Sequence, residues 1–168
     1  MQAVMIPKRL LELARERGVD VESRVTDLLL RDLSLNPDAE AEVHLEVAER
    51  YLKEAREQLS KADPVQASEK MYKAAEEAIK ALAAKLRLPE HGEAMREGRW
   101  WTQLLGRAAR SLAKKLGEPR IVDSWSRAYD VHVWGFHEAK YSASDIEEDL
   151  PYVEWLVDYA LKKLKLQS

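Results

Sequence analysis

Cysteine is absent from the 168 residues of this sequence, which excludes a disulfide framework, a thiolate metal site and a cysteine nucleophile. Apolar runs long enough to span a bilayer are also absent, and the first residues carry no apolar core followed by a small-residue cleavage site. We therefore expect a cytoplasmic protein that has no membrane partner.

Neither sign of charge dominates the composition. Asp and Glu number 30 and Lys and Arg 27, so the formal net charge is -3 and any nucleic-acid site would have to be local. Asparagine occurs once and glutamine five times, whereas ion-pairing residues are abundant. This bias is typical of heat-adapted proteins, and we expect the source to be a thermophile.

Glycine and proline are scarce, with six of each, and nearly all of them separate segments of helical periodicity. Asp20 and Asp63 are placed to cap helices, and Asn36-Pro37 breaks the chain. The periodic segments predict helices over residues 7–17, 20–33, 38–61, 64–86, 99–116 and 120–134, a last helix from 144 or 149 to 164, and a loop at 87–98. No segment alternates at period two for long enough to predict a strand.

The predicted fold class is therefore all-α, an antiparallel helical bundle with an N-terminal helical hairpin. Residues 1–36 are expected to form the hairpin, docked on the bundle as an appendage, and residues 37–168 the bundle itself. The turn between residues 38–61 and 64–86 is so short that these long helices are predicted to lie antiparallel.

Arg127 and His132 are the first candidates for chemistry. An arginine that holds a phosphate and a histidine that moves a proton, with four residues between them, are typical of one kind of ribonuclease. Five residues turn an α-helix by about 140° beyond a full turn, so the two side chains do not share a face of one helix. The alternative is that His132 is a hydrogen-bonded residue on an apolar face with Trp125 and Phe136.

His132 also belongs to a cluster of residue types that ligate metals, Asp130, His132, His137 and Glu138. Their spacing matches no metallohydrolase pattern, and we expect Gly135 to interrupt the helix among them. We therefore predict no metal and no cofactor, and we retain Asp130, His137 and Glu138 as candidate binding residues.

Bases and acids separate along the second half of the chain. Residues 98–117 contain five bases and no acid, and Arg107, Arg110 and Lys114 share a helical face that would follow a phosphate backbone. Residues 141–160 contain six acids and no base. The alternative is that the two segments face each other or stay solvated.

Two further patterns have structural interpretations. Glu69, Lys73, Glu76 and Lys80 lie opposite an apolar stripe, which predicts exposed ion pairs along one helix. The five tryptophans predict core packing, and a dimer interface is the alternative because tryptophan is enriched at interfaces.

Three blocks of sequence resemble the archaeal PaREP family, small paralogous proteins of heat-loving archaea that are similar to the HEPN superfamily of helical bundles. The blocks are Asp63-Pro-Val-Gln-Ala-Ser-Glu-Lys-Met-Tyr-Lys-Ala-Ala-Glu-Glu-Ala-Ile-Lys-Ala-Leu, Gly98-Arg-Trp-Trp and Trp125-Ser-Arg-Ala-Tyr-Asp-Val-His-Val-Trp-Gly-Phe-His-Glu-Ala. The resemblance covers most of residues 37–161 and implies a HEPN-like bundle that is a homodimer. The aromatic residues of 125–136 favour a two-fold axis beside that helix.

The same resemblance implies a role for Arg127 and His132, because active HEPN ribonucleases bring such pairs from two protomers into one cleft and need no metal. Two positions depart from those enzymes. Ala128 replaces a polar residue, and Trp134 stands where toxins silenced by a nucleotidyltransferase partner carry tyrosine. Many HEPN-like domains are inactive, so we expect a non-catalytic module that binds a nucleotide, RNA or a partner protein, with the ribonuclease as the alternative.

Residues 1–33 resemble a ribbon-helix-helix DNA-binding arm. The resemblance lies in Ala3-Val-Met-Ile-Pro-Lys-Arg-Leu-Leu and in two helices split at Gly18-Val-Asp20. That fold needs a strand that pairs across a dimer, and only residues 4–6 can supply it. A DNA-binding dimer is thus a third hypothesis, and a plain hairpin packed on the bundle is its alternative.

Overall fold

The computed structural model of the protein describes residues 2–165 and confirms the all-α prediction. This part of the chain contains eight α-helices, one π-helix and no strand. The elements are α1 (Lys8–Glu16), α2 (Val21–Leu33), α3 (Pro37–Ser60), α4 (Pro64–Lys85), α5 (Pro89–Glu97), α6 (Thr102–Leu116), α7 (Arg120–Val131), η1 (His132–His137) and α8 (Ala143–Lys165). None of these helices is both long and apolar enough to cross a membrane. Met1 and residues 166–168, the outer ends of the two predicted domains, lie outside the described residues.

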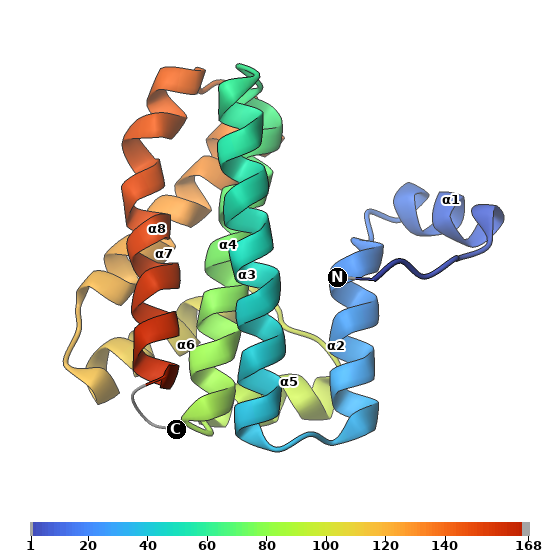
Figure 1. Ribbon diagram of the computed structural model, residues 1–168, viewed down its shortest axis with the longest axis vertical. Coiled ribbons are helices and arrows are strands. Elements are labelled where there is room, and N and C mark those ends of the chain that lie inside the picture. Colours follow the sequence, from blue (N-terminus) through green and yellow to red (C-terminus); the bar gives the residue numbers. More distant parts are fainter. Residues whose placement is uncertain (1, 166–168) are drawn as a thin grey trace.

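Local signals fix where α3 and α4 begin. The side chains of Asn36 and Asp63 each accept a hydrogen bond from the backbone N–H three residues further on, at 2.9 and 3.0 Å. Pro37 and Pro64 follow them in the first turn, where a missing N–H costs no helical hydrogen bond. The short connection makes α3 and α4 pack antiparallel along most of their length (Figure 1).

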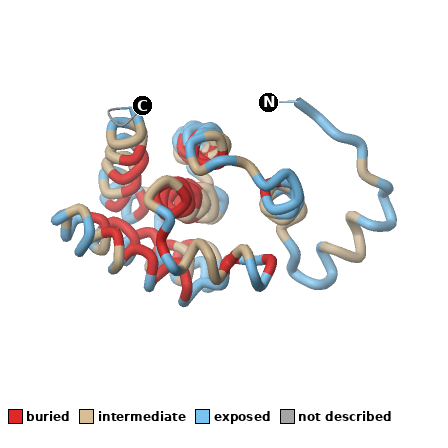
Figure 2. The backbone as a smooth tube through the Cα atoms, turned by 90° about the horizontal axis from the view of Figure 1, so that it is seen from below, coloured by how far each residue is buried: buried red, intermediate tan, exposed pale blue. Residues whose placement is uncertain are grey.

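α4 lies at the centre of the bundle and packs against α3, α6, α7, η1 and α8. Small side chains on its surface let these neighbours approach closely. They are Ala67, Ala74, Ala75, Ala78, Ala81, Ala83 and Ala84, all of them fully buried. In Figure 2 the buried residues gather in the interior of the bundle, where its helices face one another, and they form a single core.

The connection from α4 to η1 differs from the prediction in two places. Residues 87–98, predicted as a loop, contain α5, because Pro89 occupies the first turn of that helix and Gly98 ends it with a φ of 73°. Near Gly135 the helix is not interrupted, and α7 instead continues into the π-helix η1. In both places a residue type that commonly breaks helices lies within a helix: Pro89 in α5 and Gly135 in η1.

The N-terminal unit, residues 2–33, meets the bundle through α2. Leu30 is buried there, and Arg24 donates a hydrogen bond to the carbonyl of Gly98. α1 has no buried residue and projects away from the bundle (Figures 1 and 2). Residues 2–6, which the ribbon hypothesis requires as a strand, make no backbone hydrogen bond with another described residue.

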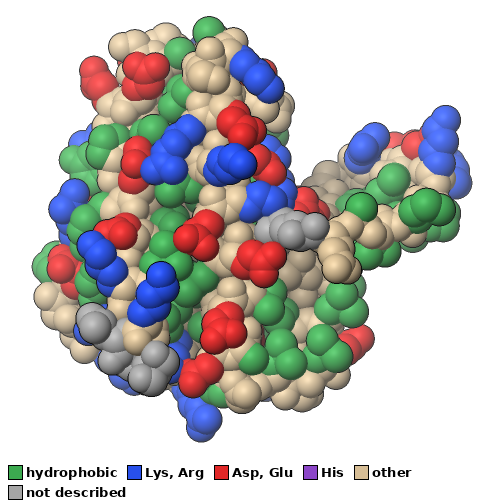
Figure 3. Space-filling view, viewed as in Figure 1, with side chains coloured by type: hydrophobic (Ala, Val, Ile, Leu, Met, Phe, Trp, Pro, Cys, Tyr) green, Lys and Arg blue, Asp and Glu red, His purple; other side chains and the backbone are tan. Residues whose placement is uncertain are grey.

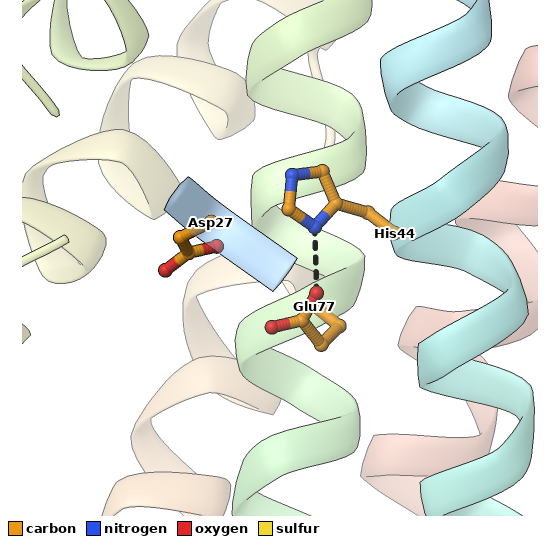
Figure 4. Close-up of side chains that lie close together, drawn as sticks. All are labelled: Asp27, His44 and Glu77. Carbon is orange, nitrogen blue, oxygen red and sulfur yellow. Dashed lines mark hydrogen bonds and ion pairs between the residues drawn. The ribbon is translucent and has the colours of Figure 1, made fainter. Parts of the chain in front are cut away.

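Charged side chains are buried where α2, α3 and α4 meet. Lys80 on α4 is 1% exposed, and its Nζ lies 2.9 Å from Glu76 Oε1, 3.0 Å from Glu77 Oε1 and 3.3 Å from Asp27 Oδ2 of α2. His44 of α3 reaches the second oxygen of Glu77 at 2.6 Å (Figure 4). The prediction that Glu76 and Lys80 form exposed ion pairs is wrong, because α2 covers that face of α4 and adds Asp27 to it.

This buried network holds Glu40, Glu77 and His44 in their charged forms. Burial by itself raises the pKa of Glu77, but the charges of Lys80 and His44 outweigh it and bring the pKa to about 2. Burial likewise raises the pKa of Glu40, and contacts with His44 and His91 lower it to about 2. Burial lowers the pKa of His44, whereas the charge of Glu77 and contact with Glu40 raise it to about 9.

We expect the protein to be most stable near pH 5 to 6. The contributions of Glu40 and Glu77 are complete above their unfolded pKa of 4.5 and are lost as the pH falls towards 2. The contribution of His44 is complete below its unfolded pKa of 6.5 and is lost as the pH rises through 9. Urea unfolding across this range measures the loss of unfolding free energy at acid and at alkaline pH. His44→Gln should reduce the loss at alkaline pH. A free energy of unfolding that increases from pH 6 to pH 10 would contradict the assignment.

Candidate functional site

An open cleft of about 700 Å³ lies between the N-terminal unit and the bundle. Residues of α4 and η1 line one side, and residues of α1 and the turn after it line the other. We call it the histidine cleft, and its principal residues are Leu11, Arg15, Asp20, Glu69, Lys73, His132, Phe136 and His137. Because it gathers two of the predicted residues with several titratable groups in one concave site, it is the candidate functional site.

The π-helix brings the two histidines of the cleft together. In a π-helix the backbone hydrogen bond joins residues five apart, which places them on one side, whereas an α-helix rotates them well away from each other. The Nε2 atoms of His132 and His137 are accordingly 3.0 Å apart. Gly135 allows this turn to lie against α4, since a Cβ at that position would stand 2.8 Å from Ser68 Cβ and closer still to its Oγ.

Aromatic rings hold His132 in place. Its ring stacks on Tyr72 with 3.9 Å between centroids and an interplanar angle of 20°, and Phe136 lies nearly parallel at 5.9 Å. Its Nδ1 is 3.4 Å from Glu69 Oε2, and neither of these two buried atoms has a hydrogen-bond partner. The side chain is 18% exposed, so the imidazole is fixed in orientation but not sealed from the cleft.

Fixed charges surround the histidines. Burial raises the pKa of Glu69, but His132 and Lys73 outweigh it, so that the carboxyl stays ionised. Burial also raises the pKa of Asp20, and its ion pair with Lys73 lowers it overall. Lys73 in turn has a raised pKa, because Asp20 more than offsets the effect of burial. Within the cleft these charges are paired, and exposed Arg15 adds a positive group at its rim.

The other predicted residues of this region do not line the cleft. Arg127 lies on the side of α7 that faces α8, where its Nη1 is 3.2 Å from Asp149 Oδ1. Asp130 accepts a hydrogen bond of 2.6 Å from the hydroxyl of Tyr141. Glu138 is exposed at the end of η1. The structure therefore unites His132 with His137 and separates both from Arg127.

The basic residues predicted on one helical face lie on α6, outside the cleft. Arg107 forms an ion pair of 2.7 Å with Glu93, and Arg110 donates a hydrogen bond of 3.2 Å to the carbonyl of Gly106. Lys114 is exposed. Binding of a phosphate backbone along this face remains a prediction, and the pairing of Arg107 weakens the field that would attract such a ligand.

A second cluster brings together atoms of the kinds that ligate metals. One ligand atom each from Asp27, His44 and Glu77 lies within 4.8 Å of the others (Figure 4). The ammonium of Lys80 already lies 3.0 Å from Glu77 and 3.3 Å from Asp27, so a cation balances these carboxylates. We interpret this cluster as a structural charge network.

Glu69 and Lys73 are cleft residues that periodicity does not reveal. Their spacing predicts an exposed pair, and they do form an ion pair at 3.4 Å. Both side chains are only 17% exposed, however, because the N-terminal unit and η1 cover them. Asp20 is confirmed as the cap of α2, but its contact with Lys73 depends on tertiary packing that no local signal encodes.

These features define an all-α bundle of long antiparallel helices, with a π-helical turn at the candidate site and a small N-terminal helical unit. The model of the Archaeal PaREP1/PaREP8 family matches residues 43–157, from α3 to the middle of α8. The chain belongs to the Archaeal PaREP1/PaREP8 family. Residues 1–42, which include the N-terminal unit, lie outside the matched region.

Two solved structures are similar to this chain in sequence and fold. A crystal structure of the Sulfolobus solfataricus protein SsR10 is 39% identical, covers 70% of this chain and 96% of its own, and superposes with a TM-score of 0.65. A solution structure of the same target gives 38% identity, 71% and 92% coverage and a TM-score of 0.63. No curated protein matches the chain.

Proposed function

We propose that the protein is a HEPN-like, non-catalytic module that binds a nucleotide or single-stranded RNA in the histidine cleft. One observation carries this proposal: Arg127 is paired with Asp149 beside α8, whereas His132 faces the cleft. Metal-independent cleavage of RNA needs the cation and the imidazole at the same phosphate. A single chain therefore offers a binding site without the assembled catalytic pair.

The chemistry of the cleft suits such a ligand. Arg15, His132 and His137 provide donors for phosphate oxygens, and the ring of Phe136 offers a face on which a base can stack. The cleft volume of about 700 Å³ lies within the range of small-molecule sites. The antiparallel long helices and the Arg127–His132 spacing support the HEPN-like part of the proposal.

Replacing Arg15 and His137 together by alanine is expected to weaken RNA binding at least about tenfold, or roughly 1.4 kcal/mol. Both side chains are exposed, so the double variant should keep the fold. Fluorescence anisotropy with a labelled single-stranded oligoribonucleotide measures the affinity. The control is Arg107→Ala with Lys114→Ala on α6, which removes two bases far from the cleft. A loss confined to the α6 variant would contradict the proposal and place the ligand on the basic helical face.

The ribonuclease remains the second candidate because His132 is partly exposed rather than sealed. In the predicted homodimer, exposed Tyr129 and Trp134 would face the two-fold axis, and Arg127 of one protomer would have to reach the cleft of the other. Cleavage would then leave cyclic phosphate ends, persist in chelator and fail on DNA, and His132→Ala would lose about 100- to 10,000-fold in rate. Absence of cleavage by the unmodified protein, with binding retained, would exclude this candidate.

A further inference from the structure

Two imidazole nitrogens meet in the histidine cleft in an arrangement that a linear hydrogen bond does not explain. The Nε2 atoms of His132 and His137 are 3.0 Å apart, and the planes of the two rings are inclined by 79°. Two rings that met head-on at these nitrogens would have centroids further apart than the 4.4 Å observed. The two nitrogens therefore cannot both point along the line that joins them, and at least one is directed to the side.

The separation of these nitrogens suits a metal ion bound to both of them. Zinc–nitrogen bonds are about 2.0 to 2.1 Å long, so nitrogens 3.0 Å apart subtend an angle of about 94° at a shared ion. That angle lies just above the octahedral value and below the tetrahedral one, and Zn²⁺ has no d-electron preference between these geometries. Imidazole is also among the ligands that suit Zn²⁺ and its neighbours in the first transition row.

Glu69 favours the tautomer of His132 that binds metals. Nδ1 of His132 faces Glu69 Oε2 at 3.4 Å, and both atoms are buried without a hydrogen-bond partner. Lys73 contacts the other carboxylate oxygen, Oε1, and leaves Oε2 to the imidazole. A proton on Nδ1 offers Oε2 a donor and leaves the lone pair of Nε2 free in the cleft. A carboxylate behind the imidazole is the usual partner of a metal-binding histidine, because it fixes the tautomer and raises the basicity of the ligand.

We propose that His132 and His137 form a site for a divalent transition-metal ion such as Zn²⁺, with Glu69 orienting His132. The remaining coordination positions of the ion are open to water or to an anionic oxygen in the cleft. Acidic and basic side chains are interspersed over the face of the bundle drawn in Figure 3, and the formal net charge is only -3, so the general attraction of the surface for cations is weak. Affinity for the ion therefore comes from the local ligands.

This site differs from the metal cluster considered from the sequence. Asp130 is bonded to Tyr141 and does not line the cleft, and Glu138 is exposed at the end of η1. The prediction that the region binds no metal rests on spacing along the sequence and on an interruption at Gly135, whereas η1 is continuous through that residue.

The metal site does not depend on the proposed function, because the ion can bind without a nucleotide. With the ion in place, a phosphate oxygen can occupy one of its open positions instead of accepting from the two imidazoles. Only this last step rests on the proposed function.

Titration of Zn²⁺ into the full chain without an affinity tag, at about pH 7.5 where an ordinary imidazole is neutral, tests the proposal by calorimetry. One ion should bind per chain. His137→Ala removes one ligand at an exposed position, so it should keep the fold and weaken binding at least about 100-fold. The control His91→Gln removes an imidazole that pairs with Glu40 outside the cleft, and it should leave the affinity unchanged. No binding at millimolar Zn²⁺, or equal losses in the two variants, would overturn the proposal.

Nitrogen NMR of the imidazoles locates the ion independently. Zinc should shift the signals of His132 and His137 and leave those of His44 and His91 in place. Glu69→Gln should weaken binding roughly 10- to 100-fold, but the shifts should still be complete at saturating zinc, because both ligands remain. Shifts confined to His44 would place the ion in the buried charge network and overturn the proposal. RNA binding without zinc binding would overturn the metal site alone and leave the proposed function standing.

Discussion

Lys80→Ala is expected to lower the free energy of unfolding by about 3 to 5 kcal/mol, the cost of leaving a buried charge without its partner. Lys80 is 1% exposed and contacts Asp27, Glu76 and Glu77 at once, so its removal leaves three carboxylates close together. The largest loss should fall on the contact between α2 and α4, because Asp27 belongs to α2. Guanidinium unfolding followed by circular dichroism measures the effect.

The matched control for this change is Lys162→Ala. Lys162 also forms an i, i+4 ion pair, with Asp158 at 2.8 Å, but its side chain is 73% exposed. Water screens such a pair, so its loss should change stability by less than about 1 kcal/mol. Equal effects of the two substitutions would show that the network around Lys80 is not buried as described.

Gly135→Ala is expected to destabilise the fold by about 1 to 3 kcal/mol, since it forces an atom into a packed contact. The new Cβ would stand 2.8 Å from Ser68 Cβ and 3.0 Å from Ile146 Cδ1, and Ser68 is fully buried on α4. η1 would have to move off α4, which should also separate His132 from His137. Thermal unfolding measures the first effect, and the imidazole signals in an NMR spectrum report the second.

A second substitution makes this prediction specific. Ser68→Gly removes the two closest atoms that the new methyl group meets and leaves only Ile146 Cδ1 at 3.0 Å, so the double variant should regain part of the lost stability relative to Ser68→Gly alone. Gly92→Ala is the control, because a Cβ there meets only the mobile end of Arg96 at 3.4 Å within α5. Alanine favours a helix over glycine, so that change should be neutral or stabilising by up to about 1 kcal/mol. Failure of Ser68→Gly to rescue would indicate that backbone conformation, and not the contact with α4, requires Gly135.

Sequence reasoning succeeds where the signal is local. The caps at Asp20 and Asp63 are confirmed, since each acts within a turn of its own position. The same rules misplace residues 87–98, because proline and glycine nine residues apart serve equally as the two ends of a short helix or as parts of a loop. Only the length of the segment then distinguishes a helix from a loop, and a segment of nine residues is too short for its length to be informative.

The candidate site depends on signals that are not local. His132 and His137 come together only because the chain adopts π-helical geometry, and that choice rests on the fit of Gly135 against Ser68 of a different helix. The burial of Lys80 follows from α2, which covers a face of α4 that periodicity assigns to solvent. Helical periodicity identifies one apolar stripe per helix and gives no indication that a second, charged face is covered as well.

The central position of α4 also means that different parts of the protein open on different timescales. Its backbone is enclosed by neighbours on nearly every side, so its amide hydrogens can exchange with water only when most of the bundle opens. α1, with no buried residue, has little in a single chain to slow its motion. The histidine cleft has one side on each of these parts. If the cleft binds a ligand as proposed, fast movements of its outer wall would set how often that ligand enters, while the slow inner wall would keep the imidazoles in place.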